Sequence, residues 1–175
     1  MNLDVKMAYR KLRQLVGSPM WVNCPESVQL DTQTRCNLDC VYCNVQKRSS
    51  NPKGTMPIET IRYITEYFKG SKLWCIAPFM NGDPLLEERL PQILDLIGGS
   101  GQEAVLDTNG TFTKNLEMLI HPSLKLVRFT ISASTPQTYE KVHGKPLFET
   151  AWNSVRWFEK NKLTSQKLWI NYIEN

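Results

Sequence analysis

The sequence predicts an α/β fold, namely a partial (β/α) barrel of parallel strands. Apolar, strand-like runs alternate with segments of helical periodicity along most of the chain. Such alternation is typical of right-handed βαβ units that share one parallel sheet. One of the runs, residues 73–80, is continuously apolar, as expected for a strand covered on both faces. Five strands and four intervening helices can be counted, which is more than half of a (β/α) barrel.

The N-terminal part, residues 1–26, is predicted to form a short amphipathic helix and a connector. Apolar residues recur there at roughly helical spacing among basic residues as far as Gly17, which Ser18-Pro19 follows. The barrel, residues 27–175, then begins with a strand over residues 28–34, where apolar and polar residues alternate. This strand leads directly into a loop that holds three cysteines.

Eight further elements alternate along the rest of the chain. The helices are marked by apolar residues three and four positions apart and the strands by apolar runs or alternation. In chain order they are a helix over 58–68, a strand over 73–80, a helix over 90–97, a strand over 104–108, a short helix over 114–120, a strand over 126–134, a helix over 148–161 and a strand over 168–173.

Composition and charge restrict the class of protein. The 175 residues are enough for one core but not for two domains of ordinary size. The net charge of +4 comes from basic residues spread along the chain, so nucleic acid is not indicated as a partner. Five cysteines, three of them within eight residues, do not suggest a secreted disulfide framework, and no apolar run approaches a membrane span. We therefore expect a cytoplasmic protein without a membrane partner.

The three clustered cysteines, Cys36, Cys40 and Cys43, predict a metal centre. Structural zinc normally takes four protein ligands, and a cubane iron–sulfur cluster used for electron transfer takes four thiolates. Here the group stops at three, with no further Cys or His close by in the sequence. Three ligands leave one metal position open, as in catalytic metal sites. The spacing favours a [4Fe–4S] cluster; a half zinc site completed by a partner, or three unrelated core cysteines, remain as alternatives.

The segment CNLDCVYC, residues 36–43, resembles the CxxxCxΦC signature of the radical S-adenosylmethionine (SAM) superfamily, with Tyr42 as the aromatic residue. The resemblance implies a [4Fe–4S] cluster whose open iron binds SAM. It implies reductive cleavage of SAM to methionine and a 5′-deoxyadenosyl radical, which abstracts hydrogen from a substrate. An electron donor such as flavodoxin or ferredoxin is implied as well. The family core is an open six-stranded barrel, of which the sixth strand and helix are missing from residues 27–175.

Two further motifs resemble those of the family, and each follows a predicted strand, where parallel barrels collect their chemistry. Asn81-Gly82-Asp83-Pro84 resembles the GGEP motif, which implies that Gly82 and Asp83 hold the SAM amino group. A plain turn into a helix is the alternative. Thr108-Asn109-Gly110 resembles the TNG turn near the cofactor, which implies a role for Asn109, although Asn-Gly is also simply a good turn.

Ser132 and His143 complete the implied cofactor contacts. Ser132 stands where relatives place a serine near the SAM ribose and carboxylate. It belongs to the polar face of strand 126–134, which should line the barrel if the apolar face meets the helices. His143 ends a stretch that resembles one ending in Arg-Gly, so a histidine replaces the arginine expected at the SAM carboxylate. On the last predicted strand, the alternation of side chains alone places Asn171 toward the interior of the barrel.

Together these patterns predict a radical SAM enzyme that abstracts hydrogen from an unknown substrate, such as a peptide, a cofactor precursor or another small molecule. They predict no particular catalytic side chain. A truncated or degenerate relative that binds a cluster without catalysis is one alternative, and a zinc or iron–sulfur binding module is another. The open strand edge at residues 168–173 predicts a partner, a dimer or a further C-terminal portion.

Overall fold

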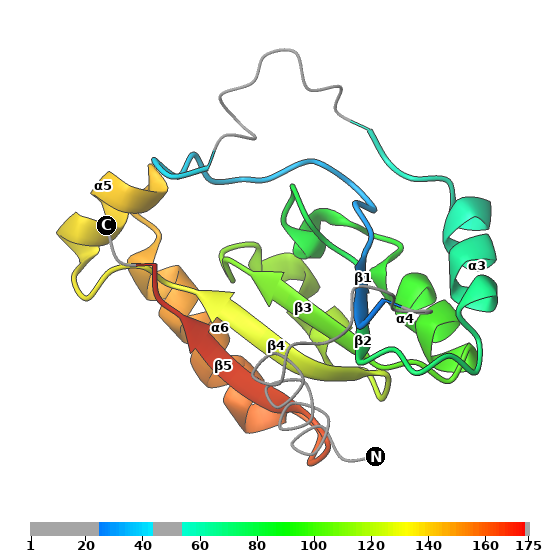
Figure 1. The fold of residues 1–175 in the computed structure, drawn as a ribbon. Helices are drawn as coiled ribbons and strands as arrows, with labels where there is room; N and C mark the ends of the chain where they lie inside the picture. Colours follow the sequence, from blue (N-terminus) through cyan, green and yellow to red (C-terminus); the bar gives the residue numbers. More distant parts are fainter. Residues whose placement is uncertain (1–24, 44–53, 174–175) are drawn as a thin grey trace, which may run out of the picture.

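The structure is a computed structural model that describes residues 25–43 and 54–173. Its centre is a five-stranded sheet in the order β1-β2-β3-β4-β5, in which every neighbouring pair is parallel (Figure 1). Because spatial order equals chain order, each crossover advances the sheet by one strand, as in a (β/α) barrel. The predicted fold class is confirmed, whereas the predicted N-terminal helix lies outside the described residues.

Strands and helices alternate along the described chain. Their bounds, in chain order, are β1 Ser27–Gln29, α3 Ile58–Tyr67, β2 Cys75–Ala77, the 3₁₀ helix η1 Pro84–Leu86, α4 Leu90–Gly99, β3 Ala104–Thr108, the 3₁₀ helix η2 Thr113–Leu119, β4 Leu124–Thr130, α5 Pro136–His143, α6 Phe148–Asn161 and β5 Lys167–Asn171.

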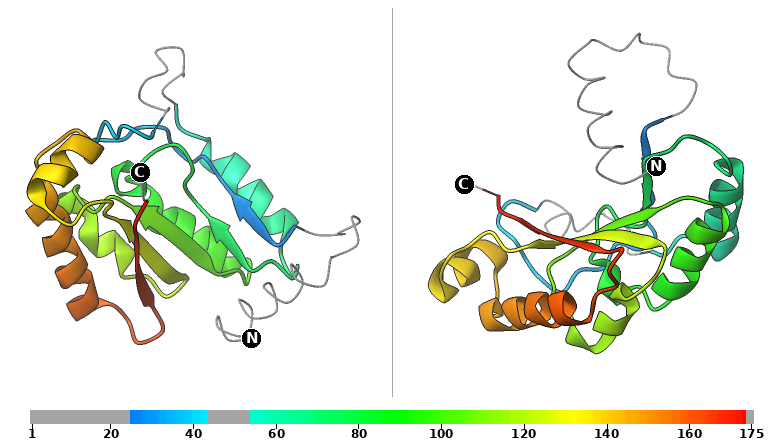
Figure 2. Two further views of the ribbon diagram at one scale, coloured as in Figure 1. Left: turned by 60° about the vertical axis from the view of Figure 1, so that its left-hand side comes forward. Right: turned by 90° about the horizontal axis from the view of Figure 1, so that it is seen from below.

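The helices cover one face of the sheet, and the main core lies between the two layers (Figure 2). Val127 and Phe129 on β4 are completely buried there, together with Ile97 of α4 and Phe158 of α6. The rings of Phe129 and Phe158 meet at a centroid distance of 5.9 Å. The apolar face predicted for the fourth strand therefore does meet the helices. None of the described helices is both long and apolar enough to cross a membrane.

The opposite face of the sheet changes from apolar to polar along the strands. In a parallel sheet, side chains of register partners point to the same side, so each cross-strand row has one character. The row formed by Val105 and Leu126 is buried in a small apolar cluster with Cys75. Two residues further along, the row consists of Asp107 and Arg128. Polar side chains therefore collect toward the carboxyl ends of the strands.

The first two strands are shorter than predicted. The chain leaves the backbone hydrogen-bond ladder of the sheet early and forms side-chain contacts instead. Pro78 cannot donate a backbone hydrogen bond, and β2 ends just before it. Its carbonyl instead accepts a hydrogen bond of 3.0 Å from the hydroxyl of Thr32. The fourth strand runs over Leu124–Thr130 rather than 126–134, and the predicted short helix after the third strand is 3₁₀ and kinked at Asn115.

Helix α5 has no counterpart in the prediction. It begins at a Thr135 cap, whose hydroxyl accepts a hydrogen bond of 3.2 Å from the Thr138 amide, and Pro136 occupies its first turn. It ends at Gly144, which has a φ of +78°. These are ordinary helix start and stop signals, so the sequence contained enough information to find the helix. It carries His143 into the site described next.

Candidate functional site

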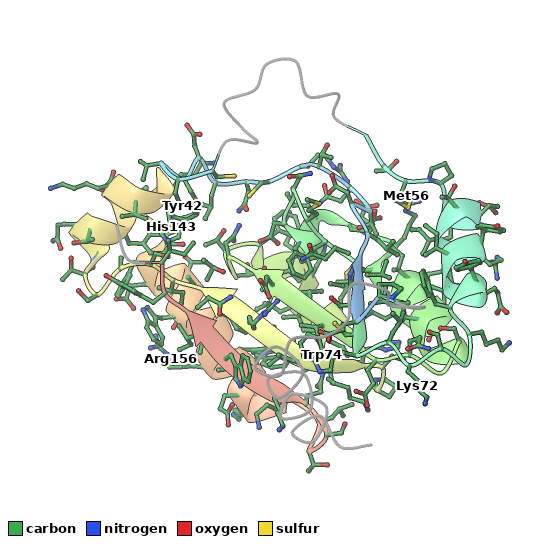
Figure 3. The ribbon with its side chains drawn as sticks, in the orientation of Figure 1. Tyr42, Met56, Lys72, Trp74, His143 and Arg156 are labelled. Atoms are coloured by element: carbon green, nitrogen blue, oxygen red, sulfur yellow. The ribbon has the colours of Figure 1, made fainter. Side chains whose placement is uncertain are left out.

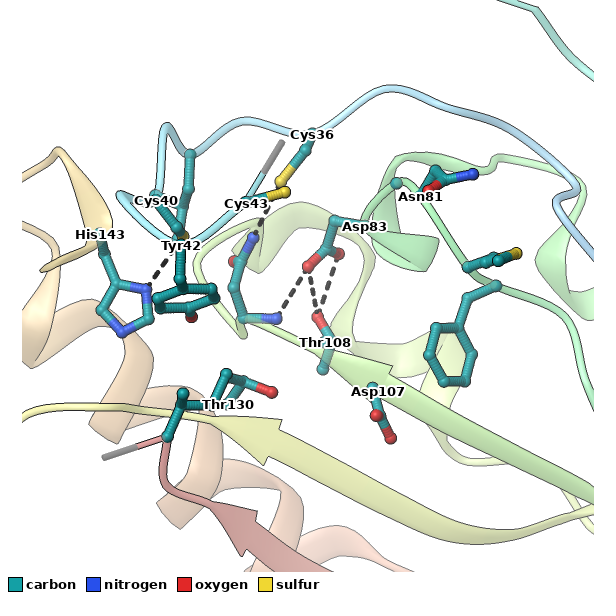
Figure 4. A pocket seen from close by; sticks show the side chains of 16 residues that line it. Cys36, Cys40, Tyr42, Cys43, Asn81, Asp83, Asp107, Thr108, Thr130 and His143 are labelled. Atoms are coloured by element: carbon teal, nitrogen blue, oxygen red, sulfur yellow. Dashed lines mark hydrogen bonds between the residues drawn. The ribbon is translucent and has the colours of Figure 1, made fainter. Parts of the chain in front are cut away.

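A cavity of about 250 Å³ lies at the carboxyl ends of the strands, below the cysteine loop of residues 36–43 (Figure 4). The loop forms one wall, and the ends of β2, β3 and β4 form others. Most of the predicted site residues line it: Cys36, Cys40, Tyr42, Cys43, Gly82, Asp83, Asn109 and His143. Ser132 does not line the cavity, but its backbone amide donates a hydrogen bond to the ring of His143.

The cysteine loop is hydrogen-bonded to the C-terminal turn of α5, although the two segments are far apart in the sequence. The amide of Asp39 donates to the carbonyl of His143 at 3.2 Å, and that of Val41 donates to the carbonyl of Val142 at 2.9 Å. These carbonyls have no partner within the helix, so the loop satisfies them. A Cβ on Gly144 would lie 2.8 Å from the Asp39 carbonyl oxygen, so this position requires glycine for space as well as for its positive φ.

A second anchor joins the loop entrance to the end of β2. The side chain of Gln33 is buried and donates to the carbonyl of Asp83 at 2.7 Å, while the Asp83 amide donates to the carbonyl of Arg35 at 2.8 Å. A Cβ on Gly82 would lie 2.7 Å from the carbonyl oxygens of both Gln33 and Arg35. Gly82 is therefore needed for a close approach between two backbones. The predicted SAM contact of Gly82 stays a prediction.

The carboxylate of Asp83 is buried and joins the ends of β2 and β3. It accepts hydrogen bonds from the Thr108 hydroxyl at 3.0 Å, from the Asn109 amide at 2.8 Å and from the Leu85 amide at 3.0 Å. Burial raises the pKa of Asp83, and these bonds oppose that shift. Its apparent role is structural in this geometry, and a contact with the SAM amino group stays a prediction.

Cys36, Cys40 and Cys43 form no disulfide in the described part of the chain; they are half-buried, and their thiols point toward the cavity (Figure 4). Burial raises the pKa of Cys36, and it raises that of Cys40 to about 11, so binding a metal must displace protons. Among the described residues, no three His, Cys, Asp or Glu side chains are grouped closely enough to hold a single ion. The prediction that the three cysteines hold a [4Fe–4S] cluster stays a prediction.

His143 is buried between the loop and the end of β4, and its tautomer follows from its contacts (Figure 3). Its Nε2 accepts a hydrogen bond of 3.1 Å from the amide of Ser132. Burial lowers the pKa of His143 to about 4, so the ring is neutral at pH 7 and its proton is on Nδ1. Nδ1 lies 3.2 Å from the sulfur of Cys40 and therefore donates to it. Both ring nitrogens are thus engaged, and the predicted contact with the SAM carboxylate stays a prediction.

Asn109 makes a second contact with a cysteine sulfur. Its Nδ2 lies 3.7 Å from the sulfur of Cys36 and 3.0 Å from Oδ1 of Asn37. Asn109 is nearly buried, and its Oδ1 accepts hydrogen bonds from Thr111. Two of the three cysteines thus receive an N–H donor from a different part of the chain. Donors of this kind orient metal ligands and adjust the properties of the metal.

Tyr139 is a site residue that sequence reasoning did not select. Its ring is buried and stacks on His143 at a centroid distance of 4.2 Å. Its hydroxyl is buried and has no hydrogen-bond partner in the described part of the chain. Burial raises the pKa of this phenol, and the charge of Cys40 raises it further. Tyr139 does not line the cavity itself but packs against His143, which does.

The fold and site define a class of protein, a parallel partial barrel with three clustered cysteines over a cavity at its strand ends. Comparison with known families identifies the class. The profile of the radical SAM superfamily matches residues 30–173, so the chain belongs to this superfamily. The resemblance stated from the cysteine motif is confirmed.

Two curated relatives are enzymes. Over 120 residues the chain is 30% identical to the probable GTP 3′,8-cyclase of Methanocaldococcus jannaschii, an alignment that covers 66% of this chain and 39% of the relative. It is 26% identical over 127 residues to the AdoMet-dependent heme synthase of Methanosarcina barkeri, and this alignment covers 71% of this chain and 36% of the relative. The chain thus spans well under half the length of each relative.

The fold also matches solved structures. Streptococcus suis SuiB bound to S-adenosylmethionine superposes with a TM-score of 0.72 at 14% identity, covering 95% of this chain and 38% of SuiB. At this identity the match concerns the fold alone, and it confirms the partial barrel.

Proposed function

We propose that this protein is a radical SAM enzyme in which Cys36, Cys40 and Cys43 hold a [4Fe–4S] cluster and the cavity below them holds SAM. The observation that carries the proposal is the convergence of three cysteine thiols from one short loop on a cavity at the carboxyl ends of parallel strands. When bound, the cluster and SAM supply a 5′-deoxyadenosyl radical that abstracts hydrogen from the substrate. An external one-electron donor such as a flavodoxin or ferredoxin would reduce the cluster.

The surrounding residues would orient the cysteines and exclude water. The C-terminal turn of α5 and the Gln33 anchor fix the two ends of the cysteine loop. His143 and Asn109 donate to two of the cysteine sulfurs. Tyr42 lies edge-on to the His143 ring at a centroid distance of 6.0 Å and lines the cavity beside Cys40. A reducing compartment such as the cytoplasm would keep the thiols free.

Anaerobic reconstitution with iron and sulfide tests the proposal. After reduction, electron paramagnetic resonance should give a [4Fe–4S]⁺ signal that changes when SAM is added, and 5′-deoxyadenosine should accumulate. Cys40→Ala should lose the cluster, whereas the control Cys75→Ala should keep it, because Cys75 is buried in the apolar cluster of the sheet. Cluster retention in Cys40→Ala, or zinc in place of a cluster, would contradict the proposal.

A cluster-binding protein without catalysis is the second candidate. It is favoured by the Asp83 carboxylate, which is already occupied by Thr108, Asn109 and Leu85, and by His143 in place of an arginine. In that case the reconstituted cluster would form but its resonance signal would not respond to SAM. Asp83→Ala discriminates further: weakened SAM binding with an intact cluster supports the enzyme.

A further inference from the structure

The described lining of the cavity offers hydrogen-bond acceptors but no cationic side chain. Asp83 and Asp107 are the carboxylates among these lining residues, and no lysine or arginine is among them. His143 also lines the cavity, and it is neutral at pH 7 because burial lowers its pKa to about 4. An ionised carboxylate only accepts hydrogen bonds, so it cannot bind another carboxylate or a phosphate. The lining therefore favours a ligand that donates hydrogen bonds.

The two carboxylates differ in what they have left to offer a ligand. Both oxygens of Asp83 already accept hydrogen bonds, from backbone amides and from the Thr108 hydroxyl. Asp107, whose side chain is 25% exposed, accepts through Oδ1 from Nε of Arg128, and its Oδ2 accepts from no donor in the described part of the chain. Burial raises the pKa of Asp107, and the charge of Arg128 opposes that shift and so favours the ionised form. Oδ2 of Asp107 is therefore available to a ligand.

Asp107 lies at the end of the cavity remote from the cysteines. It precedes Asn109 by two residues, and Nδ2 of Asn109 lies 3.7 Å from the sulfur of Cys36. Because a strand rises by about 3.3 Å per residue, Asp107 lies about 7 Å further along β3 from the cysteine loop. Figure 4 shows it on the side away from the loop. The next row of the sheet, Val105 and Leu126, is buried and apolar, so the polar lining ends at Asp107.

Neutral side chains from three other strand ends line the same cavity. Phe79 and Met80 follow β2, Ile173 follows β5, and Thr130 ends β4. Thr130 lies two residues beyond the register partner of Asp107, so their side chains point to the same face of the sheet. Its hydroxyl can both donate and accept. The cavity thus combines apolar surface with a free carboxylate oxygen and a hydroxyl on one face.

We propose that Asp107, assisted by Thr130, binds a hydrogen-bond donor group of the substrate, an amine or a hydroxyl, at the end of the cavity remote from the cysteines. The word substrate rests on the proposed radical SAM function, whereas the donor site itself does not. Asp107 is then a residue that determines specificity. The substrate class that follows is a molecule with an apolar segment that ends in an amine or a hydroxyl and carries no carboxylate or phosphate there.

Saturation-transfer NMR of the anaerobic, cluster-loaded chain tests the site with three probes of equal length. The probes are n-butylammonium, 1-butanol and butyrate, which differ in the charge and the hydrogen-bonding capacity of one end. We expect saturable binding of n-butylammonium or 1-butanol and none of butyrate. The tighter of the first two tells a charged donor from a neutral one.

Variants locate the binding at Asp107. Asp107→Asn keeps an acceptor for Arg128 but puts an N–H in place of the available oxygen, so it should weaken the donor probe by at least about tenfold. Asp107→Glu retains the carboxylate and should weaken it less, and Thr130→Val should weaken it by about twofold to tenfold. The matched control is Asp95→Asn, because Asp95 is a surface carboxylate that pairs with His121, and it should change nothing.

The proposal is overturned if neither donor probe binds saturably, if butyrate binds as tightly as they do, or if Asp107→Asn binds as the wild type does. The last result would also be seen if the amine bound iron instead of the carboxylate. Urea denaturation checks that Asp107→Asn is folded; if it is not, wild-type binding in both Asp107→Glu and Thr130→Val overturns the proposal.

The inference and the proposed function can fail separately. Cluster content and 5′-deoxyadenosine formation are measured on the same preparation as the binding of the probes. Their failure with intact binding at Asp107 would reject the proposed function and leave the donor site. An active cluster without such binding would reject the donor site alone.

Discussion

The two faces of the sheet differ in the roles of their side chains. The face under the helices is mostly apolar, and its residues, such as Val127 and Phe129, belong to the main core together with residues of several helices. The face toward the cavity changes from Val105 and Leu126 to Asp107, Arg128 and Thr130 within a few residues. One strand therefore contributes both to the core and to the lining of the cavity, because alternation sends successive side chains to opposite sides. The comparison predicts that adjacent substitutions on β4 should have very different effects.

The largest effect on stability is expected on the helix face. Phe129→Ala should lower the free energy of unfolding by about 3–5 kcal/mol, because it leaves a cavity in a fully buried core. The neighbouring Thr130→Ala, on the cavity face, should cost less than about 1 kcal/mol. Urea denaturation of the cluster-free protein measures both. Equal losses would mean that the two faces do not differ in packing as described.

A smaller effect is expected where the cysteine loop meets α5. Gly144→Ala should cost about 2–3 kcal/mol, since it combines a left-handed backbone with a clash against the Asp39 carbonyl. Cluster loading should fall as well. Gly101→Ala is the matched control, because its φ is also +78° but a Cβ would contact nothing within 4 Å. It should cost about 1–2 kcal/mol and leave cluster loading unchanged; a loss of loading in both variants would refute the anchor.

The buried histidine should make stability depend on pH. The pKa of His143 is lowered to about 4, against about 6.5 in an unfolded chain. Between these values the unfolded chain binds the proton and the folded protein does not, so stability is lost as pH falls from 6.5 toward 4. The loss should be about 1–3 kcal/mol in the cluster-free protein. His143→Gln should lack this component, and identical pH profiles for the two proteins would contradict the assignment.

The subtlest effect concerns the reduction potential. A hydrogen bond to a cysteine sulfur stabilises the more negative, reduced cluster and so raises its potential. His143→Leu removes the donor to Cys40 and should lower the potential, whereas His143→Asn retains an N–H and should lower it less. Redox titration followed by electron paramagnetic resonance measures the shift, with cluster content as the control. An unchanged potential in His143→Leu would show that the contact with Cys40 has no electronic role.

The parts of the molecule differ in how far the sequence determines them. The spacing of apolar residues was sufficient to predict the five strands and most of the helices, because the buried residues of this fold follow that spacing closely. The three cysteines were equally easy to select, since they lie within eight residues of the chain. Helix α5 was missed because its apolar stripe is weak, although its caps at Thr135 and Gly144 were readable.

Contacts between distant residues could not be predicted. The pairing of Asp107 with Arg128 depends on the register of β3 and β4, and a one-residue slip would remove it. The contact of His143 with Cys40 spans 103 residues and depends on the position of an unpredicted helix. Gly82 was selected for an approach to SAM, but its tight neighbours are the backbone atoms of Gln33 and Arg35.

The contact between the cysteine loop and α5 also has a consequence for biosynthesis. Cys40 leaves the ribosome 103 residues before His143, the residue that holds it. At a synthesis rate of about 5–20 residues per second, this interval is about 5–20 s. During that time the contact between Cys40 and His143 cannot form. Insertion of the proposed cluster into the complete site would therefore follow the synthesis of most of the barrel.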